Sequence, residues 1–176
     1  MTCIPQPALS ITTFWPFENT SKRIQNHPNI LFPSGELVIN LVMGAEIKNI
    51  SIIGSGNVAH NLGRMAYKAG VGIDSIYSRD ISNAAKLAEQ LDAQSVDNLG
   101  AVSSASEMLL FAVKDDVLAE VGSSLSGSSQ ILAHTSGSME MNVFGGAPRS
   151  AVCYPLQTFS KSKQYDGVSF PICIEA

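Results

Sequence analysis

The sequence predicts an α/β fold in which a doubly wound, mostly parallel sheet is covered by helices on both faces, as a three-layer αβα arrangement. Two observations carry this prediction. Short runs that are apolar almost throughout, such as residues 50–53 and 108–113, are typical of strands buried on both faces. Such runs alternate with segments whose apolar residues recur at helical spacing, and this alternation implies parallel strands joined by right-handed crossovers.

Length and composition narrow the class of protein. A chain of 176 residues is long enough for one domain with a sizeable core. The net charge of -4 gives no electrostatic reason to expect a nucleic acid or an anionic membrane as partner. No apolar run reaches the length of a membrane span, and the first residues lack the pattern of a signal peptide. We therefore expect neither nucleic acid nor membrane as a partner.

The cysteines and histidines indicate no metal site. The three cysteines are odd in number and show no C-x-x-C spacing, so we expect neither a disulfide framework nor a zinc site. A reducing, cytoplasmic compartment fits this pattern best. The residues concerned are Cys3, Cys153, Cys173, His27, His60 and His134.

Residues 1–46 differ from the rest of the chain. Five of the eight prolines lie there, and proline at this density prevents regular helix and central strand. Residues 37–43 could form one short strand or an exposed hydrophobic segment. We interpret residues 1–42 as a poorly ordered extension or the product of an upstream start site; the alternative is a capping or partner-binding arm. The folded domain is expected over residues 47–176.

Residues 48–70 are the stretch around which the domain is organised. A strand-like run leads into the pattern G-x-G-x-x-A, carried by Gly54, Gly56 and Ala59. From Val58 the apolar residues follow helical spacing, and Gly70 stands where a left-handed residue is expected to end the helix. Strand, glycine turn and helix in this order are the context of a Rossmann-type dinucleotide-binding turn.

Each position of this pattern has a physical role. Gly54 permits the tight turn, Gly56 lets a pyrophosphate approach the backbone, and Ala59 allows the helix to pack closely on the strand. The helix N-terminus offers free N–H groups and partial positive charge. The alternative is a glycine-rich turn that binds nothing. The predicted pyrophosphate site consists of Gly54, Ser55, Gly56, Asn57 and Val58.

The remaining elements follow in order. A second strand is expected over residues 72–77, followed by a helix capped by Asp80 or Ser82. A short third strand over 93–96, a turn near 99–102 and a fourth strand over 108–113 come next. The predicted apolar face of the helix consists of Ile81, Ala84, Ala85, Ala88 and Leu91.

The last third of the chain continues the alternation. Asp115 or Asp116 is expected to cap a helix, and a fifth strand follows over residues 130–134. A brief helix over 139–144 and two late strands, over 150–154 and 168–174, complete the domain. The helix after the fourth strand has an apolar face made of Val117, Leu118, Val121 and Leu125.

The end of the second strand predicts the choice of cofactor. In NAD-binding domains an acidic residue about 20 positions past the glycines accepts the ribose hydroxyls. Here Ser78 and Arg79 stand at the strand end, whereas Asp74 lies inside the strand and Asp80 is better used as a helix cap. A guanidinium would pair with the 2′-phosphate of NADP, so we expect NADP rather than NAD. Alternatively, Arg79 is only a solvated loop residue.

Ligands of open α/β sheets lie beyond the carboxyl ends of the strands, so the later strand ends supply the other candidates. On the cofactor side these are Ala112, Val113, Lys114 and Thr135; on the substrate side they are His134, Tyr154 and Gln157. His134 could transfer a proton near neutral pH, or could equally be a hydrogen-bonded structural residue. We expect His60 to point away from its helix's apolar face and to be solvated.

Five segments resemble a known family. IIGSGNVAHNLG, YSRD, LLFAVKDD, AHTSGSM and CYPLQTFSK occur in the order seen in NADP oxidoreductases with a Rossmann-like N-terminal domain and a helical C-terminal domain of uncharacterised function. The resemblance covers residues 47–176. It extends more distantly to pyrroline-5-carboxylate reductase, deazaflavin-dependent NADP oxidoreductases and the 6-phosphogluconate dehydrogenase group.

The resemblance implies roles for the same residues. Residues 54–58 would hold the pyrophosphate, Ser78 and Arg79 the 2′-phosphate, and residues 112–114 the ribose and nicotinamide. The segment 154–160 matches a loop that faces nicotinamide and substrate. The relatives continue into a helical domain that completes the substrate pocket and forms the dimer. This resemblance implies that the 176-residue chain lacks that domain and that the full-length protein is a homodimer.

Three functional hypotheses remain from the sequence. The leading one is the cofactor-binding domain of an NADP-dependent oxidoreductase that moves hydride to or from a small carbonyl or imine substrate. The second is a regulator that binds NADPH and performs no reaction, because the sequence contains no decisive acid–base pair. The third is a binder of an adenine nucleotide or methyl donor, against which Arg79 weighs. The catalytic residues stay unassigned.

Overall fold

Eight strands form one sheet in the computed structural model, which describes residues 2–4, 47–163, 165 and 170–176. Their order across the sheet is β1-β8-β7-β6-β5-β2-β3-β4. The strands are β1 (Thr2–Ile4), β2 (Asn49–Ile53), β3 (Gly72–Tyr77), β4 (Gln94–Val96), β5 (Met108–Phe111), β6 (Ile131–His134), β7 (Ser150–Pro155) and β8 (Ile172–Glu175).

The strand order reverses next to β2. From β2 the chain passes to β3 and then β4 on one side, and afterwards returns to β5 on the other side of β2. The pairs from β4 to β7 are all parallel, and β8 joins β7 as an antiparallel strand. These pairings confirm the predicted doubly wound, mostly parallel sheet.

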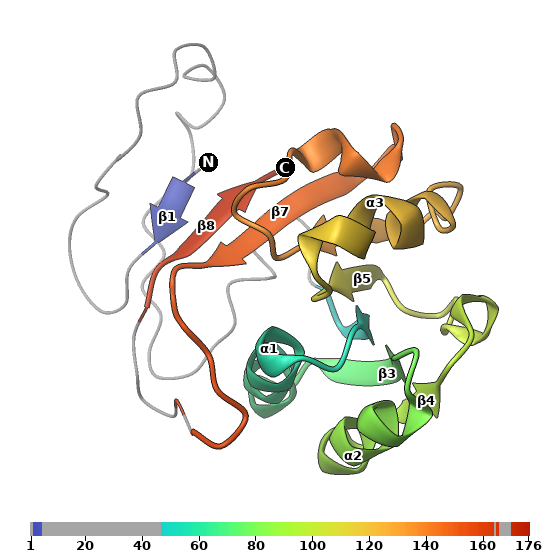
Figure 1. Ribbon diagram of the computed structural model, residues 1–176, viewed down its shortest axis with the longest axis vertical. Coiled ribbons are helices and arrows are strands. Elements are labelled where there is room, and N and C mark those ends of the chain that lie inside the picture. The colour runs from blue at the N-terminus through green and yellow to red at the C-terminus, as the bar shows by residue number, and fades with distance from the viewer. Residues whose placement is uncertain (1, 5–46, 164, 166–169) are drawn as a thin grey trace.

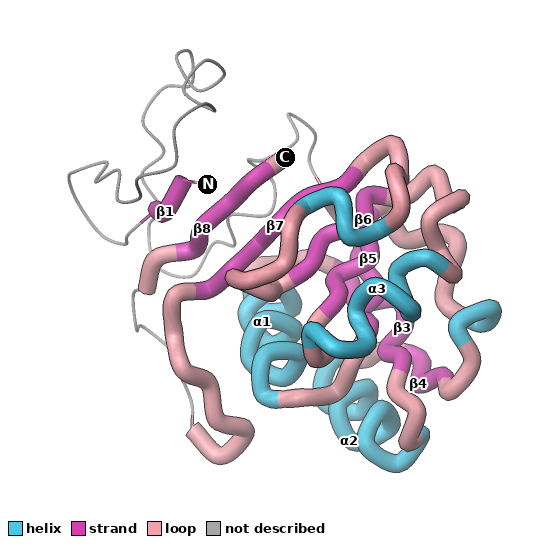
Figure 2. Tube along the Cα trace, turned by 45° about the horizontal axis from the view of Figure 1, so that its top comes forward, coloured by secondary structure: helices cyan, strands magenta, loops and turns pink. Residues whose placement is uncertain are grey.

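Helices cover both faces of the sheet, as Figures 1 and 2 show. Helices α1 (Asn57–Lys68) and α2 (Ile81–Leu91) pack on one face, in a core cluster that contains Ile50 and Ile52. Helix α3 (Asp115–Ser123) and the 3₁₀ turn η3 (Met141–Phe144) pack on the other, in a cluster with Ile53. Neighbouring residues of β2 thus point to opposite faces, which confirms the three-layer αβα arrangement.

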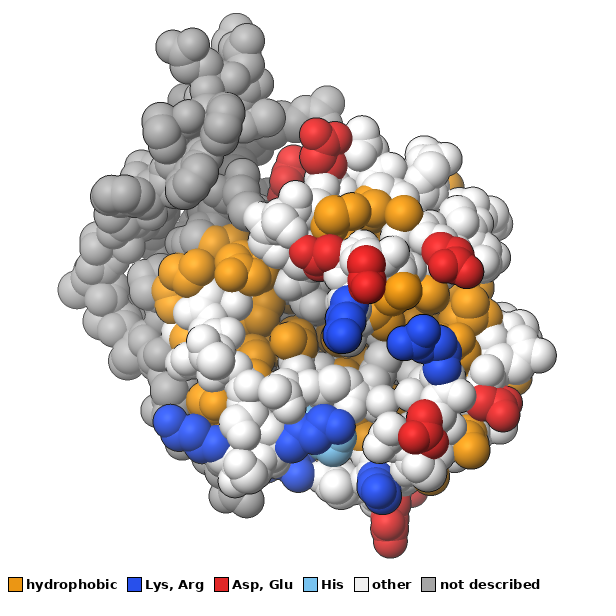
Figure 3. Space-filling view, viewed as in Figure 1, with side chains coloured by type: hydrophobic (Ala, Val, Ile, Leu, Met, Phe, Trp, Pro, Cys, Tyr) orange, Lys and Arg blue, Asp and Glu red, His pale blue; other side chains and the backbone are white. Residues whose placement is uncertain are grey.

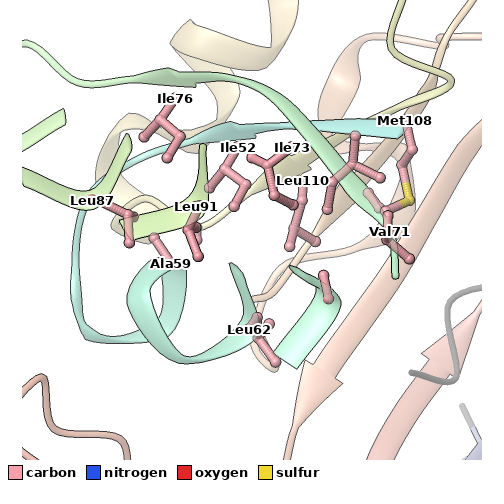
Figure 4. Close-up of a cluster of buried hydrophobic side chains, with 14 of the residues drawn as sticks. Ile52, Ala59, Leu62, Val71, Ile73, Ile76, Leu87, Leu91, Met108 and Leu110 are labelled. Atoms are coloured by element: carbon pink, nitrogen blue, oxygen red, sulfur yellow. The ribbon is translucent and has the colours of Figure 1, made fainter. Parts of the chain in front are cut away.

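The first core cluster joins α1 and α2 to the central strands (Figure 4). Ile52 and Leu110 are completely buried under these helices, as expected for strands covered on both faces. The one polar side chain within the apolar run of β2 is also accommodated. The Ser51 hydroxyl lies 2.7 Å from the hydroxyls of both Ser75 and Ser106, so this buried group is hydrogen-bonded.

Helix α2 differs from the prediction in the face that it buries. Asp80 caps the helix as expected, because its carboxylate accepts the Ser82 N–H at 3.0 Å. The predicted face was wrong at Ile81 and Ala85, which are exposed, and it omitted Leu87, which is completely buried. The buried residues of α2 are Ala84, Leu87, Ala88 and Leu91, a stripe rotated from the predicted one.

The junction between β5 and α3 also differs. The strand ends at Phe111, two residues earlier than expected, and neither aspartate caps the helix, whose N-cap is the extended Lys114. Asp115 is the first helical residue, and its carboxylate accepts the Ser138 hydroxyl at 2.5 Å. The aspartates therefore act in the first turn, where negative charge complements the helix dipole.

The ends of the described chain meet at one edge of the sheet. Residues 2–4 form β1, which pairs antiparallel with β8 and so differs from the expected irregular extension. The remaining extension, including the possible strand over residues 37–43, lies outside the described residues. Strand β8 begins only at Ile172.

Cys173 is disulfide-bonded, which the cysteine count did not predict, whereas Cys153 is a free thiol.

The prediction that His60 is solvated was wrong. The segment after β7 folds back onto α1, where the Asn61 amide donates to the Ser160 carbonyl at 3.2 Å. His60 is left 7% exposed. Burial, reinforced by the positive charges of Lys161 and Arg64, lowers the pKa of His60 from 6.5 to about 4. The imidazole is therefore neutral at pH 7.

This pKa shift predicts a loss of stability in acid. Between pH 6.5 and about 4 the unfolded chain binds a proton at His60 and the folded chain does not. The free energy of unfolding should therefore decrease as the pH falls through this window, by up to about 3 kcal/mol from this residue. Urea denaturation at pH 7 and pH 4.5 measures the difference.

The control is His60→Gln, which keeps a polar side chain of similar size and removes the titration. The variant should lose part of the pH dependence. A remainder is expected because burial also lowers the pKa of His134. Identical pH dependence in the two proteins would contradict the assignment.

Candidate functional site

A cavity of about 340 Å³ lies at the carboxyl ends of β2, β3 and β5, where the strand order reverses. This is the position at which open α/β sheets bind ligands. The cavity is lined by Gly54, Ser55, Gly56, Tyr77, Ser78, Arg79, Leu99, Ala112, Val113, Lys114, Val117, Glu120, Val121 and Ser124. Eight of the predicted cofactor-binding residues are among them, brought together from three separate strand ends.

Gly54 makes the turn after β2 possible. Its φ of +123° is a conformation that side chains disfavour, and its N–H donates to the Tyr77 carbonyl at 2.8 Å. A Cβ atom built on Gly54 would collide with the backbone carbonyl oxygen of Ala112 and lie 3.3 Å from Val113 Cγ1. The first glycine therefore allows the ends of β2, β3 and β5 to converge.

Gly56 has a different role. It is the N-cap of α1 with an ordinary φ of −78°, and a Cβ built on it would meet nothing within 4 Å. No side chain caps α1, so its first N–H groups, beginning with that of the exposed Asn57, are left for another partner. The half-buried Val58 follows in the same turn. An open glycine before an uncapped helix N-terminus fits a phosphate group.

A hydrogen bond joins the glycine turn to the end of β3. The Ser55 hydroxyl donates to the Ser78 hydroxyl at 3.0 Å, and the Asp80 N–H donates to the same oxygen at 3.3 Å. Because the Ser78 oxygen accepts both bonds, its own proton is free to be donated to a ligand in the cavity.

Arg79 is the cation at the end of β3. Its side chain is exposed, and it makes no hydrogen bond or ion pair with the described part of the chain. The neighbouring Asp80 carboxylate caps α2, and Asp74 lies further back, inside β3, where it accepts the Ser106 hydroxyl at 2.6 Å. The tip of β3 therefore presents a guanidinium and a hydroxyl, without a free carboxylate.

The end of β5 forms another wall of the cavity. The Ala112 N–H donates to the Ile53 carbonyl at 2.8 Å, which keeps this small residue next to the glycine turn. Val113 is half-buried, and the exposed Lys114 follows it before α3 begins. Figure 3 shows Lys and Arg side chains beside hydrophobic ones in the middle of the molecular face in view.

The sequence did not single out six lining residues: Tyr77, Leu99, Val117, Glu120, Val121 and Ser124. Three of them lie in the first two turns of α3, which starts a few residues after the end of β5 and so borders the strand ends. Periodicity had placed Val117 and Val121 on the apolar face of this helix, and that face also borders the cavity. Glu120 adds a carboxylate to a lining that also contains the cations of Arg79 and Lys114.

Thr135 does not line the cavity. It is 8% exposed, and both its hydroxyl and its N–H donate to the Phe111 carbonyl at 3.1 Å. This residue therefore ties the end of β6 to the end of β5. Its role toward a cofactor stays a prediction.

His134 is completely buried at the end of β6. Its Nε2 lies 3.3 Å from the Glu140 carbonyl oxygen, and its ring meets Phe144 edge-on at a centroid distance of 5.6 Å. Burial lowers the pKa of this imidazole below its ordinary value, so it is neutral at pH 7. The structure thus gives His134 the surroundings of a core residue, away from the cavity lining.

Tyr154 and Gln157 lie beyond His134, at the end of β7. The Tyr154 ring packs on the backbone of Gly137, where a Cβ would come within 2.8 Å of it. The Gln157 side-chain oxygen accepts the Thr158 N–H at 2.9 Å. Neither residue lines the cavity, so their substrate-side role stays a prediction.

Two other classes of feature are absent from the described residues. Among them, no helix is long and apolar enough to cross a membrane. The same residues contain no group of three or more His, Cys, Asp and Glu side chains that could hold a metal ion.

Comparisons with known proteins bear on the whole domain. Residues 49–135 match the family described as "NADP oxidoreductase coenzyme F420-dependent". The chain is 34% identical to a putative NADP oxidoreductase from Bacteroides fragilis, with a TM-score of 0.66 over 73% of this chain and 51% of that one. The chain thus spans about half the length of this relative.

More distant structures share the fold. A pyrroline-5-carboxylate reductase from Coxiella burnetii is 16% identical with a TM-score of 0.56, over 63% of this chain and 45% of that one. A prephenate dehydrogenase from A. aeolicus is 12% identical with the same TM-score, over 67% and 46%. No curated protein matches the chain.

The match and the cavity lead to the same assignment. The family match spans β2, the glycine turn, both following strand ends and Thr135, which together carry every predicted cofactor-binding residue. The 34% identity extends this relationship beyond the matched residues. The chain therefore carries a cofactor-binding domain of the NADP oxidoreductase family, whose members bind nicotinamide dinucleotides.

Proposed function

We propose that this domain binds NADP in preference to NAD. The observation that supports the proposal is that Ser78 and Arg79 follow each other at the end of β3 and both line the cavity that contains the glycine turn. A 2′-phosphate there would accept the free Ser78 proton and pair with the guanidinium through charge-assisted hydrogen bonds. The ribose hydroxyls of NAD would find no free carboxylate at this strand end.

The other end of the dinucleotide would lie over the ends of β2 and β5. The pyrophosphate would approach Gly56 and the N-terminus of α1, where a Cβ meets open space and no side chain caps the helix. Ala112 and Val113 are small enough to leave room for the ribose and nicotinamide, and the exposed Lys114 could donate to a ribose or phosphate oxygen.

We further propose that the protein to which this domain belongs moves hydride to or from a small carbonyl or imine substrate. Bound nicotinamide would supply the redox chemistry, and the chain's residues would supply positioning and electrostatics. Tyr154 and Gln157, at the end of β7, are the side chains that the sequence predicts on the substrate side. We propose that a helical domain completes the pocket and that the whole protein is a homodimer.

A second candidate is a regulator that binds NADPH without reacting. One observation favours it: His134, the single histidine at these strand ends, is completely buried and does not line the cavity. The two candidates share the cofactor site and differ in turnover, so activity separates them.

The first prediction tests the choice of cofactor. Arg79→Ala should weaken NADPH binding about ten- to a hundredfold and leave NADH binding unchanged, because only NADPH carries the phosphate that the guanidinium pairs with. Isothermal titration of both cofactors measures this. Arg149→Ala is the matched control, since Arg149 is exposed and outside the cavity lining. Equal losses for NADPH and NADH would refute the assignment.

The second prediction separates the two glycines. Gly56→Val should abolish binding of both cofactors at nearly unchanged stability, because its side chain would enter open space that the pyrophosphate needs. Gly54→Ala should instead lower the free energy of unfolding by about 1–3 kcal/mol or more, through a strained φ and overlap with the Ala112 carbonyl. Urea denaturation and cofactor titration of each variant distinguish the roles.

The third prediction concerns turnover. The cofactor-binding domain by itself should bind NADPH without oxidising it at a robust rate. Positioning of the substrate, worth about 7–11 kcal/mol of the barrier, needs the second pocket wall that we propose a helical domain supplies. The measurement is steady-state NADPH oxidation over a panel of small aldehydes, ketones and imines. Saturable turnover by a longer protein that includes further helices would support the oxidoreductase, and its absence there would favour the regulator.

A further inference from the structure

A second pocket, of about 440 Å³, lies between α1, α2 and the segment that follows β7. It is lined by His60, Arg64, Asn83, Lys86, Glu89, Gln90 and Lys161. None of these residues lines the cavity at the strand ends. The proposed cofactor site therefore does not account for this pocket.

The pocket concentrates positive charge in a chain whose net charge is -4. Arg64, Lys86 and Lys161 face it with one carboxylate, that of Glu89, and none of the three cations forms an ion pair with a described residue. Basic side chains adjoin a histidine in the lower part of Figure 3. Three cations gathered with a single carboxylate raise the local potential for anions.

The guanidinium of Arg64 is held in place by a neutral partner. Its Nε and Nη2 donate to the Gln90 side-chain oxygen at 3.1 and 2.5 Å, and the Gln90 amide donates to the Lys86 carbonyl at 2.9 Å. Two of the five guanidinium N–H groups are thus engaged, and the others remain for a ligand. Because Gln90 is uncharged, this arrangement orients Arg64 without neutralising it.

His60 is a further polar residue of the pocket lining. It is 7% exposed, lines the pocket, and its Nδ1 atom is buried with no hydrogen-bond partner among the described residues. Buried polar atoms are rarely left without a partner. The neutral imidazole therefore leaves hydrogen-bonding capacity unused beside Lys161 and Arg64, whose charges act on it.

We propose that this pocket binds a small molecule bearing an oxyanion group, a phosphate or a carboxylate, through Arg64, Lys86 and Lys161. A planar guanidinium pairs with the oxygens of either group in a bidentate manner, and the two ammonium groups add further donors. The volume exceeds that of a bare ion and lies in the range of small-molecule sites. This site is separate from the dinucleotide site, and the proposal for it does not depend on the proposed cofactor binding.

The test follows the ring proton signals of His60 by NMR during titration of the 176-residue chain with inorganic phosphate and, separately, with citrate. The signal is assigned with His60→Gln. We expect a saturable shift with at least one probe, and the stronger response identifies the phosphate or carboxylate source. Lys161→Gln and Lys86→Gln, both at exposed positions, should each weaken binding about tenfold or more, and Arg64→Gln should do likewise.

Two control variants each remove one positive charge from a residue outside this pocket. Lys163→Gln removes an exposed lysine outside the pocket lining, and Arg79→Gln removes the cation of the strand-end cavity. Both should leave the His60 titration unchanged. The proposal is wrong if neither probe causes a saturable shift of the His60 signals. It is also wrong if Lys161→Gln and Lys86→Gln do not weaken the binding that the shift reports, or if Arg79→Gln abolishes the shift.

Discussion

The close approach of Gly54 to the Ala112 carbonyl is the constraint on which the candidate cofactor site depends. Strand β2 is hydrogen-bonded to β3 on one side and to β5 on the other, so its end is confined between two neighbours. The chain can leave this position only through a residue without a side chain. Because the turn is this tight, Gly56 and the uncapped N-terminus of α1 lie beside Ser78, Arg79 and the end of β5, around one cavity.

The distribution of carboxylates decides which charge this cavity presents. Asp80 follows the end of β3 and Asp74 lies inside the strand, and each is engaged: Asp80 caps α2 and Asp74 accepts the Ser106 hydroxyl. The exposed Arg79 is consequently not neutralised by either of them, and the Ser55–Ser78 hydrogen bond leaves one hydroxyl proton for a ligand. The Asp80 carboxylate caps α2 and so is not free for a ribose, and this supports the preference for NADP over NAD that we propose.

The segment after β7 changes the character of α1. A helix on one face of a sheet normally exposes its outer side, but here the outer side meets this segment at Asn61 and His60. The contact leaves His60 buried and neutral and brings Lys161 close to Arg64 and Lys86. One return of the chain thus produces both the expected acid sensitivity and the basic pocket to which we assign an oxyanion.

The sequence by itself determined the αβα class, most strand positions and the glycine turn, because buried strands and tight turns impose strong local restrictions on residue type. It also identified eight lining residues, since parallel strands place their carboxyl ends along one edge. Only the tertiary structure decided the buried face of α2 at Leu87, the position of Lys114 ahead of α3, and the burial of His60 and His134. These features depend on contacts between segments distant in sequence, such as Ser160 with Asn61, which no local pattern encodes.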